Sequence, residues 1–479
     1  MTGLREVPHV IDGEECDSTG GEHFESVDPA RQSAWARVAS GSEKDAAAAV
    51  AAARRAFDEG PWPRMGPDER GRILYRLADL LKAHADELTD ADTRDMGKPI
   101  TQSRGTDVPR SALNLRFFAD YARFATDEVL PGMPGHHLYT TREPVGVVAA
   151  ISPWNFPLMQ ATWKVAPALA FGNTVVLKPA EQSPVSCHRL GMLALGAGLP
   201  PGVLNVVQGF GPGHAGEALT RHPDVDLITF TGETQTGRAI LAAGAPTLKR
   251  VSFELGGKGA NIVFDDADLD NAVDWSLRAI YLNAGQVCLS GSRLYVQRGI
   301  YDEFLRRFVA GAEAMRTGDP LDADTEIGTL SSEEHFRKVA GYLDLAADEG
   351  ATVLTGGIGD GWSVRPTALV DVTPDMRVVR EEIFGPVVAI QPFDDEGEAV
   401  RLANDSPYGL NAMLFTTDLG RAHRVAGALR AGSVWVNCFY VRDLRAPFGG
   451  YKDSGIGREG GAYSREFFTE AKAVVMQLG

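Results

Sequence analysis

Residues 145–178 read VGVVAAISPWNFPLMQATWKVAPALAFGNTVVLK, and this stretch decides the fold class. An apolar strand over 145–151 is followed by a helix over 158–171 and by a second apolar strand over 174–178. Apolar strands that alternate with helices are typical of a parallel sheet with helices on both faces. Such sheets bind their ligands at the carboxyl ends of the strands.

The alternation of strands and helices continues over most of the remaining chain. Further strands are predicted at 204–208, 226–230, 251–254, 261–264, 293–297, 352–354, 387–392 and 433–437. The helices between them are predicted at 184–197, near 215, from about 234, and at 269–282, 301–316, 333–349, 396–403 and 421–429. Short strands over 1–40 and helices over 44–91 and 107–126 come first. We therefore predict an α/β protein with two Rossmann-like, doubly wound parallel-sheet domains.

Two segments stand outside this alternation. Residues 127–137 are rich in proline and glycine and are typical of a connection. Residues 473–478 alternate enough to form a strand, but no local partner for this strand is evident. Because a terminal strand of this kind often pairs with another chain, we expect the two segments to belong to a β-strand oligomerisation arm.

Composition limits the classes of function. The chain has 479 residues, of which 44% are hydrophobic, and a net charge of −17 without a basic block, so nucleic-acid binding is not expected. Its four cysteines lie far apart with no C-x-x-C pair, which predicts neither a disulfide framework nor a metal site. The first residues have no apolar signal core and no apolar stretch is long enough for a bilayer, so we expect a cytoplasmic protein without membrane attachment.

Cys288 has partners for a specific chemistry. Glu254 precedes it by about one helix with its connections, and Asn155 lies far upstream. A thiol that attacks a carbonyl, an amide that holds the oxyanion and a carboxylate that activates water are the groups needed for thioester chemistry on an aldehyde. Alternatively, Cys288 is a buried small hydrophobe, Asn155 a turn residue and Glu254 a strand-end carboxylate.

A possible cofactor motif is FTGETQTG at 230–237, between a predicted strand and a predicted helix. Glycines let a backbone approach a pyrophosphate, and the helix N-terminus offers amide donors. The spacing alone is weak, because a plain tight turn would look the same. Glu233 is unexpected beside a diphosphate, since its carboxylate must either turn outward or bind through a cation.

Several motifs occur in the order found in one family. They are PWNFP at 153–157, LKPAEQSP at 177–184, FTGETQTG at 230–237, FELGG at 253–257, GQVC at 285–288, EEIFGP at 381–386 and PFGGYKDSGIGRE at 447–459. With these motifs the chain resembles the aldehyde dehydrogenase superfamily nearly end to end. The resemblance implies an NAD-binding domain (1–120 and 143–254), a catalytic domain (255–445) and an oligomerisation or bridging arm (121–142 and 446–479). It also implies a homo-oligomer, either a dimer or a dimer of dimers.

The same resemblance assigns catalytic roles. Cys288 would be the nucleophile, and the Asn155 side chain with the Cys288 backbone N–H would hold the oxyanion. Glu254 would deprotonate the water that hydrolyses the thioester, and Lys164 would tune the site. Transfer to coenzyme A or phosphate, as in some relatives, is less consistent with Glu254.

Cofactor-binding roles follow in the same way. Lys178 and Glu181 would bind the adenosine ribose hydroxyls, and because a carboxylate repels a 2′-phosphate, we expect NAD rather than NADP. Glu382 and Phe384 would hold the nicotinamide ribose and ring. The other expected cofactor contacts are Ile151, Ser152, Trp154, Gly211, Phe230, Gly232, Glu233, Gly237 and Leu255.

The segment NCFYVRDLRAP at 437–447 bears on the substrate, because it lies where the family closes its aldehyde tunnel. Arg442 and Arg445 on this loop, with Arg110 upstream, would suit a carboxylate. Trp163 and Phe448 would line the tunnel. The arrangement is similar to the branch that acts on 2-hydroxymuconic, 2-aminomuconic and carboxymethyl-hydroxymuconic semialdehydes. The alternatives are arginines that only form surface ion pairs, and a betaine-aldehyde or general aliphatic or aromatic aldehyde dehydrogenase.

Overall fold

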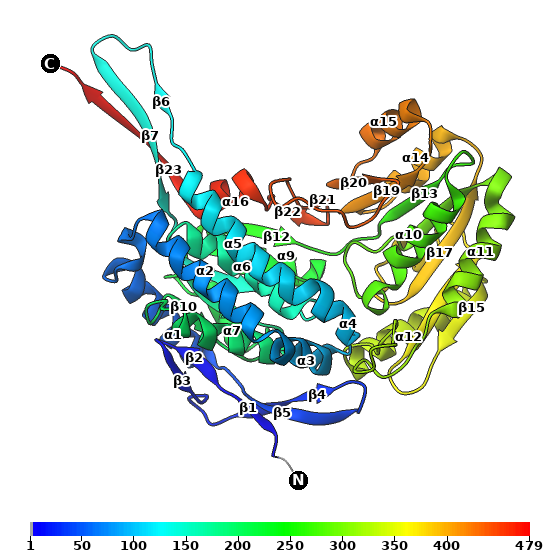
Figure 1. Cartoon of the computed structure of the whole chain (residues 1–479), viewed down its shortest axis with the longest axis horizontal. Helices are drawn as coiled ribbons and strands as arrows, with labels where there is room; N and C mark the ends of the chain where they lie inside the picture. The colour runs from blue at the N-terminus through cyan, green and yellow to red at the C-terminus, as the bar shows by residue number, and fades with distance from the viewer. Residues whose placement is uncertain (1–2) are drawn as a thin grey trace.

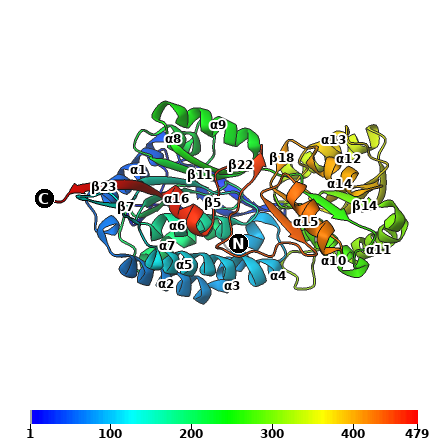
Figure 2. The same ribbon diagram turned by 90° about the horizontal axis from the view of Figure 1, so that it is seen from above.

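The computed structural model describes residues 3–479. Two α/β bodies lie side by side, each built around its own sheet, and a narrow three-stranded arm projects from the first body (Figure 1). Seen from above, the arm lies at the end of the molecule farthest from the second body (Figure 2). The chain passes from the first sheet to the second after Glu254 and returns to the first near its C-terminus.

The first body contains an eight-stranded sheet in the order β22-β12-β11-β8-β9-β10-β2-β3. The strands from β12 to β10 run parallel and are apolar on both faces, as predicted for a sheet covered by helices. The bounds are β2 His9–Ile11, β3 Glu14–Cys16, β8 Val147–Ile151, β9 Thr174–Lys178, β10 Leu204–Val206, β11 Leu227–Thr231, β12 Arg250–Glu254 and β22 Gly455–Ile456.

Helices cover both faces of this sheet. Helices α1, α8 and α9 pack on one face and α6 and α7 on the other, with α2, α3 and α5 outside them. The bounds are α1 Glu43–Asp58, α2 Pro67–Ala83, α3 Ala85–Met96, α5 Val108–Phe124, α6 Pro157–Ala170, α7 Val185–Gly196, α8 Ala215–Arg221 and α9 Thr234–Gly244. A small N-terminal sheet contains β1 Arg5–Val7, β5 Ser33–Ala39 and β4 His23–Asp28.

The second body contains a seven-stranded sheet in the order β15-β16-β17-β14-β13-β19-β20, parallel except for β15. Helices α10, α11 and α12 pack on one face, and α14 and α15 on the other. The strands are β13 Ala260–Val263, β14 Arg293–Gln297, β15 Thr352–Ile358, β16 Val364–Val370, β17 Val387–Phe393, β19 Asn411–Phe415 and β20 Ser433–Val436. The helices are α10 Leu269–Tyr281, α11 Tyr301–Ala314, α12 Glu333–Asp348, α14 Glu396–Asn404 and α15 Leu419–Ala428.

Two strands of the second sheet, β16 and β19, are absent from the sequence-based prediction. Pro366 lies within the β16 segment, and proline is typical of a strand break because it has no backbone N–H. The segment nevertheless pairs with β15 and β17. The β19 segment NAMLF is a short apolar run, which periodicity alone cannot assign to a strand or a helix. It nevertheless lies inside the sheet, between β13 and β20.

The arm consists of β6 Val129–Leu130, β7 His136–Pro144 and β23 Thr469–Gln477 in the order β23-β7-β6. The C-terminal strand pairs with β7 along its whole length, from Thr469 opposite Pro144 to Gln477 opposite His136. The segments that the sequence analysis assigned to one arm therefore lie in one sheet, in which β7 is the partner of the C-terminal strand. The partner lies far upstream in the sequence, where a local pattern cannot reveal it.

Short elements complete the chain. They are η1 Trp62–Arg64, α4 Ile100–Gln102, η2 Ser103–Asp107, η3 Ala245–Thr247, η4 Leu282–Gly285, η5 Arg298–Ile300, α13 Arg377–Arg380, β18 Tyr408–Gly409, β21 Tyr451–Lys452 and α16 Gly461–Phe468. Between residues 3 and 479, no helix combines the length and the apolar character that a membrane span requires.

Candidate active site

A cavity of about 1140 Å³ begins at the carboxyl ends of the parallel strands of the first sheet and reaches Cys288 and Asn155. The sequence-predicted cofactor residues that line it are Ile151, Ser152, Trp154, Lys178, Glu181, Gly211, Phe230, Gly232, Glu233, Leu255, Glu382 and Phe384. The structure therefore brings these residues together. Gly237 lies behind the lining, where an added Cβ would stand 2.7 Å from the Leu255 side chain, so this glycine lets α9 approach Leu255 closely.

Two carboxylates in the cavity wall have defined partners. Glu233 precedes α9, and its Oε1 accepts a hydrogen bond from Lys338 Nζ of α12 at 3.1 Å. The Glu233 carboxylate is thus paired with a cation of the protein itself, and its side chain is 68% exposed. Lys178 Nζ donates to Glu181 Oε2 at 3.3 Å, which fixes the Glu181 carboxylate at the carboxyl end of β9.

Glu382 also lies in the cavity wall. Its Oε1 accepts a hydrogen bond from the Gly257 backbone N–H at 2.8 Å, and burial raises its pKa to about 7. Nearby, Trp154 meets the Phe384 ring edge-on with centroids 5.4 Å apart. His335 completes an aromatic cluster and hydrogen-bonds the Phe384 carbonyl at 2.8 Å. Because burial lowers the pKa of His335 to about 4, its ring is neutral at neutral pH.

The nucleophile follows a sharply turned segment. Asn283, Ala284 and Gly285 are all left-handed, with φ of +52°, +52° and +72°. The Asn283 amide donates to the Asn155 carbonyl at 3.0 Å, and the Asn155 side-chain amide donates to the Gln286 carbonyl at 2.9 Å. These bonds tie Asn155 to the segment that carries Cys288.

The Cys288 thiol is electrostatically restrained. Burial raises its pKa to about 12, the carboxylates of Glu382 and Glu254 act in the same direction, and Arg442 opposes them. The thiol is therefore protonated at neutral pH in the protein alone. An additional positive charge or a base is needed to form the thiolate nucleophile.

Glu254 ends β12 and is 5% exposed. Within the described residues, neither of its carboxylate oxygens has a hydrogen-bond partner. Burial and the neighbouring Glu459 raise its pKa well above the ordinary value, against the effects of Lys164 and Arg442. A carboxylate with free lone pairs and a raised pKa is suited to accept a proton from water. Gly449 leaves room beside it, since a Cβ there would stand 2.9 Å from Glu254 Oε1.

Lys164 is fully buried on α6 and stands beside this carboxylate pair. Its Nζ donates to Thr229 Oγ1 at 3.1 Å and to Glu459 Oε1 at 3.4 Å. The Trp163 indole N–H donates to the other oxygen of Glu459. Lys164 therefore compensates a buried negative charge next to Glu254, which gives a physical form to the predicted tuning role.

Two of the three predicted substrate arginines share one region. The Arg442 guanidinium lies between two rings, 4.4 Å from the Trp163 centroid and 3.7 Å from the Phe448 centroid. One of its terminal nitrogens is buried and, among residues 3–479, has no hydrogen-bond partner. Burial lowers the pKa of Arg442 to about 10, and the like charge of Arg110 acts in the same direction, so the two cations lie close together.

Arg445 is placed differently. Its side chain is 77% exposed and forms an ion pair with Asp443 at 2.6 Å. The structure therefore gives Arg445 the surface ion pair that the sequence left open as an alternative. In the part of the chain that the structure describes, no group of three or more His, Cys, Asp or Glu side chains could hold a metal ion.

The sequence profile of the aldehyde dehydrogenase family matches residues 16–474. The chain belongs to this family. It is 49% identical to 2-hydroxymuconic semialdehyde dehydrogenase of Pseudomonas sp. strain CF600, over 99% of the chain and 100% of that protein. It is 46% identical to mitochondrial benzaldehyde dehydrogenase of Antirrhinum majus, over 98% of the chain and 88% of that protein. The solved structure of an indole-3-acetaldehyde dehydrogenase with NAD⁺ superposes with a TM-score of 0.98 at 43% identity, covering 100% of this chain and 98% of that one.

The comparisons confirm the predicted family and aldehyde dehydrogenase fold, and the cofactor of this structural neighbour agrees with the predicted NAD. Two residues at the site of this aldehyde dehydrogenase were not predicted from the sequence. The first is Glu459, which ends the motif at 447–459, and its place in that motif could have marked it as a site residue. The second is His335, and a single histidine in a helix gives no sequence signal of a functional role.

Proposed function

We propose that this enzyme uses NAD to oxidise a carboxylate-bearing, muconic-type semialdehyde to the corresponding dicarboxylic acid. The observation that carries the proposal is the Arg442 guanidinium, which is held between two aromatic rings close to Arg110 and has a buried nitrogen with no hydrogen-bond partner among residues 3–479. A buried donor of this kind costs free energy unless a ligand satisfies it. A substrate carboxylate would accept hydrogen bonds from it and compensate both charges.

The cavity residues fit NAD in their chemistry. Glu181 and Glu382 in the cavity wall offer carboxylate acceptors for ribose hydroxyls, and the first turn of α9 borders the same cavity with backbone amide donors. Glu181 disfavours a 2′-phosphate by charge repulsion. When bound, NAD accepts the hydride that leaves the aldehyde carbon.

The protein residues carry the remaining steps. Once a base has taken the Cys288 thiol proton, the thiolate attacks the aldehyde carbon. The oxyanion is held by the Cys288 backbone N–H and by the side-chain N–H of Asn155 that Gln286 does not use. Loss of hydride leaves a thioester on Cys288. Glu254 removes a proton from water, whose oxygen attacks the thioester carbon, and the C–S bond breaks to release the carboxylic acid and the thiolate.

A neutral aromatic aldehyde is the second candidate, because the Trp163 and Phe448 rings flank the site and one relative is named for benzaldehyde. In the structure, however, Arg442 covers the faces of both rings. A cationic betaine aldehyde would be repelled by two neighbouring arginines.

The test is NADH formation with 2-hydroxymuconic semialdehyde, 2-aminomuconic semialdehyde, benzaldehyde and betaine aldehyde, each with NAD and with NADP. We expect the highest kcat/KM for the two acidic semialdehydes with NAD. A higher kcat/KM for benzaldehyde would favour the second candidate, and a preference for betaine aldehyde would contradict both.

We also propose that the enzyme forms a homo-oligomer through its arm. Strand β23 lies at the edge of the three-stranded sheet, so its outer backbone groups are free to pair with another copy. Light scattering coupled to size-exclusion chromatography would show a dimer or tetramer for the intact chain. A monomer at micromolar concentration would contradict this assignment.

A further inference from the structure

The loop that carries Arg442 begins in a sparsely populated backbone conformation. Asn437 follows β20 with φ of +56°, and Tyr440 has φ of +63°. Left-handed backbone is tolerated by asparagine but is unusual for a bulky residue such as tyrosine. Such conformations persist only where the surrounding structure determines them, and they are common at functional sites.

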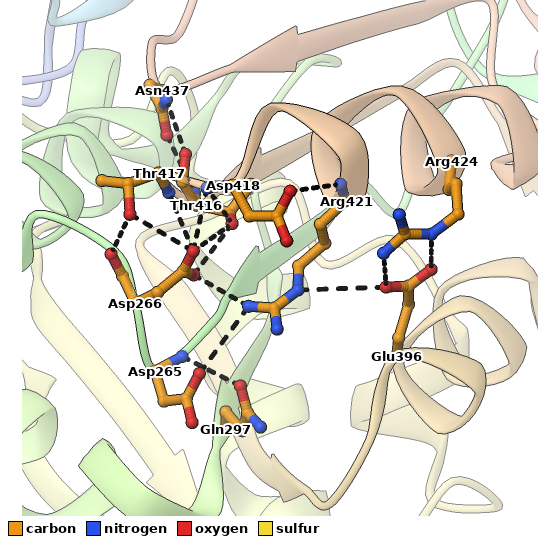
Figure 3. Close-up of polar contacts among 10 residues, drawn as sticks. All are labelled: Asp265, Asp266, Gln297, Glu396, Thr416, Thr417, Asp418, Arg421, Arg424 and Asn437. Carbon is orange, nitrogen blue, oxygen red and sulfur yellow. Dashed lines mark hydrogen bonds and ion pairs between the residues drawn. The ribbon is translucent and has the colours of Figure 1, made fainter.

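Asn437 is held by a pair of hydrogen bonds to one residue of the neighbouring strand segment (Figure 3). Its Oδ1 accepts from the Thr416 backbone N–H at 3.0 Å, and its Nδ2 donates to the Thr416 carbonyl at 2.9 Å. The side chain therefore acts like an additional strand residue that pairs with Thr416. This pairing fixes the direction in which the chain leaves β20.

Thr416 is in turn held by Asp266, which follows β13 in the middle of the sheet. The Thr416 hydroxyl lies 2.8 Å from both carboxylate oxygens of Asp266. Asp266 also accepts from the Asp418 backbone N–H at 2.9 Å and pairs with Arg421 at 2.8 Å (Figure 3). Although burial acts to raise the pKa of Asp266, these donors lower it below the ordinary value, so the carboxylate is charged at neutral pH.

The far side of the loop is fixed by a single bond. The Trp435 indole N–H donates to the Val441 carbonyl at 2.8 Å, and the Phe439 ring packs edge-on against Trp435 at 5.6 Å. Val441 directly precedes Arg442. The position of the guanidinium therefore depends on the conformation at the base of the loop.

We propose that Asp266, Thr416 and Asn437 are positioning residues for substrate selection, which hold the base of the loop so that Arg442 faces the region of Cys288. None of the three belongs to the predicted site. The inference rests on the proposed function, because it assigns these residues to the recognition of an acidic aldehyde. A misplacement of about 1 Å in a recognition group can reduce rates by up to about 10²-fold.

Two substitutions remove the hydrogen bonds of Thr416 with Asn437 or with Asp266 without preventing the left-handed backbone conformation of residue 437. Asn437→Gly keeps the freedom to adopt positive φ but removes both bonds to Thr416. Thr416→Val removes the hydroxyl that binds Asp266 while leaving the Thr416 backbone bonds to Asn437 possible. Thr416→Ser restores the hydroxyl and should rescue the enzyme.

Arg424→Gln is the matched control. Arg424 pairs with Glu396 at 3.0 and 2.8 Å in the same region and, like the network, lies on the second body (Figure 3). Its guanidinium makes no bond to Asp266, Thr416 or Asn437, and it is joined to Asp266 only through Glu396 and Arg421, which lie 3.9 Å apart (Figure 3). Loss of this pair therefore reports on general effects of removing a polar interaction there.

The first readout is kcat/KM for 2-hydroxymuconic semialdehyde and for benzaldehyde. For Asn437→Gly and Thr416→Val we expect a decrease on the order of 10-fold with the acidic substrate and of at most about 3-fold with benzaldehyde. Thr416→Ser and Arg424→Gln should resemble the wild type. Equal decreases with both substrates, or no decrease, would overturn the positioning role.

The second readout does not depend on the substrate assigned above. Alkylation of Cys288 is measured with the anionic reagent iodoacetate and with the neutral reagent iodoacetamide. The rate constant for iodoacetate divided by that for iodoacetamide reports the positive charge that faces the thiol. This ratio should fall in Asn437→Gly and Thr416→Val and stay unchanged in Thr416→Ser and Arg424→Gln. If the wild-type enzyme does not prefer acidic aldehydes but the ratio still falls, the proposed function fails and the positioning role stands. An unchanged ratio overturns the positioning role.

Discussion

Replacing Arg442 by methionine removes a guanidinium but leaves an unbranched apolar chain between the Trp163 and Phe448 rings, which lie 4.4 and 3.7 Å from the guanidinium carbon. Methionine packs well against aromatic rings, so the packing between Trp163 and Phe448 should be retained. Hydrogen bonds to a charged group contribute about 1.5–3 kcal/mol. Because 1.36 kcal/mol corresponds to about a tenfold change, kcat/KM for an acidic semialdehyde should fall by about 10- to 150-fold.

The same substitution should affect a neutral aldehyde far less. Benzaldehyde has no carboxylate to lose a partner, so its kcat/KM should change by at most about 3-fold, through lost packing and the altered field. The field change has its own signature, because Arg442 opposes the groups that raise the pKa of Cys288. The alkylation rate of Cys288 increases with pH as the thiol loses its proton. The midpoint of this increase should therefore lie at a higher pH in the variant than in the wild type.

Arg445→Met is the matched control for this prediction. Arg445 is 77% exposed and pairs with Asp443, and an exposed pair contributes little to stability. Its loss should change kcat/KM by at most about 2-fold for either substrate. The reasoning would be refuted if Arg442→Met reduced both substrates equally, or if Arg445→Met reduced the acidic substrate as much as Arg442→Met does.

Three further results are expected. The Glu254→Gln variant should form NADH in a rapid first turnover and then stop. The acyl group should be detectable on Cys288 by mass spectrometry of the intact protein. Steady turnover near the wild-type rate would contradict the water-activating role of Glu254. Because burial and Glu459 raise the pKa of Glu254, the rate of thioester hydrolysis should increase with pH through that raised pKa, and a rate independent of pH from 5 to 9 would contradict it. Gly449→Ala places a methyl group 2.9 Å from Glu254 Oε1 at a φ of +150°, so kcat should fall on the order of 10-fold or more with a smaller change in KM for NAD.

Much of the cofactor cavity could be predicted because it depends on a local pattern. Apolar strands that alternate with helices place their carboxyl ends at one edge, and Lys178 and Glu254 lie at such ends. The strand–turn–helix around 230–237 could be recognised for the same reason. These features repeat within a few tens of residues and so are visible in sequence.

The remaining features depend on contacts between distant segments. The pairing of β23 with β7 and the ion pair of Glu233 with Lys338 join residues that no local pattern connects. The two arginines of the substrate loop look equivalent in sequence, but the backbone turns Arg442 inward and Arg445 outward. Only the folded loop, with its left-handed Tyr440, distinguishes them.

The most direct test of the central claim is a competition experiment. Equal concentrations of 2-hydroxymuconic semialdehyde and benzaldehyde are incubated with the wild-type enzyme and NAD, and the two acids are separated and quantified at low conversion. The product ratio equals the ratio of kcat/KM values, whatever the individual constants are. The account predicts a ratio on the order of 10 or more in favour of the acidic semialdehyde. A ratio near or below one would contradict carboxylate recognition by Arg442 and Arg110.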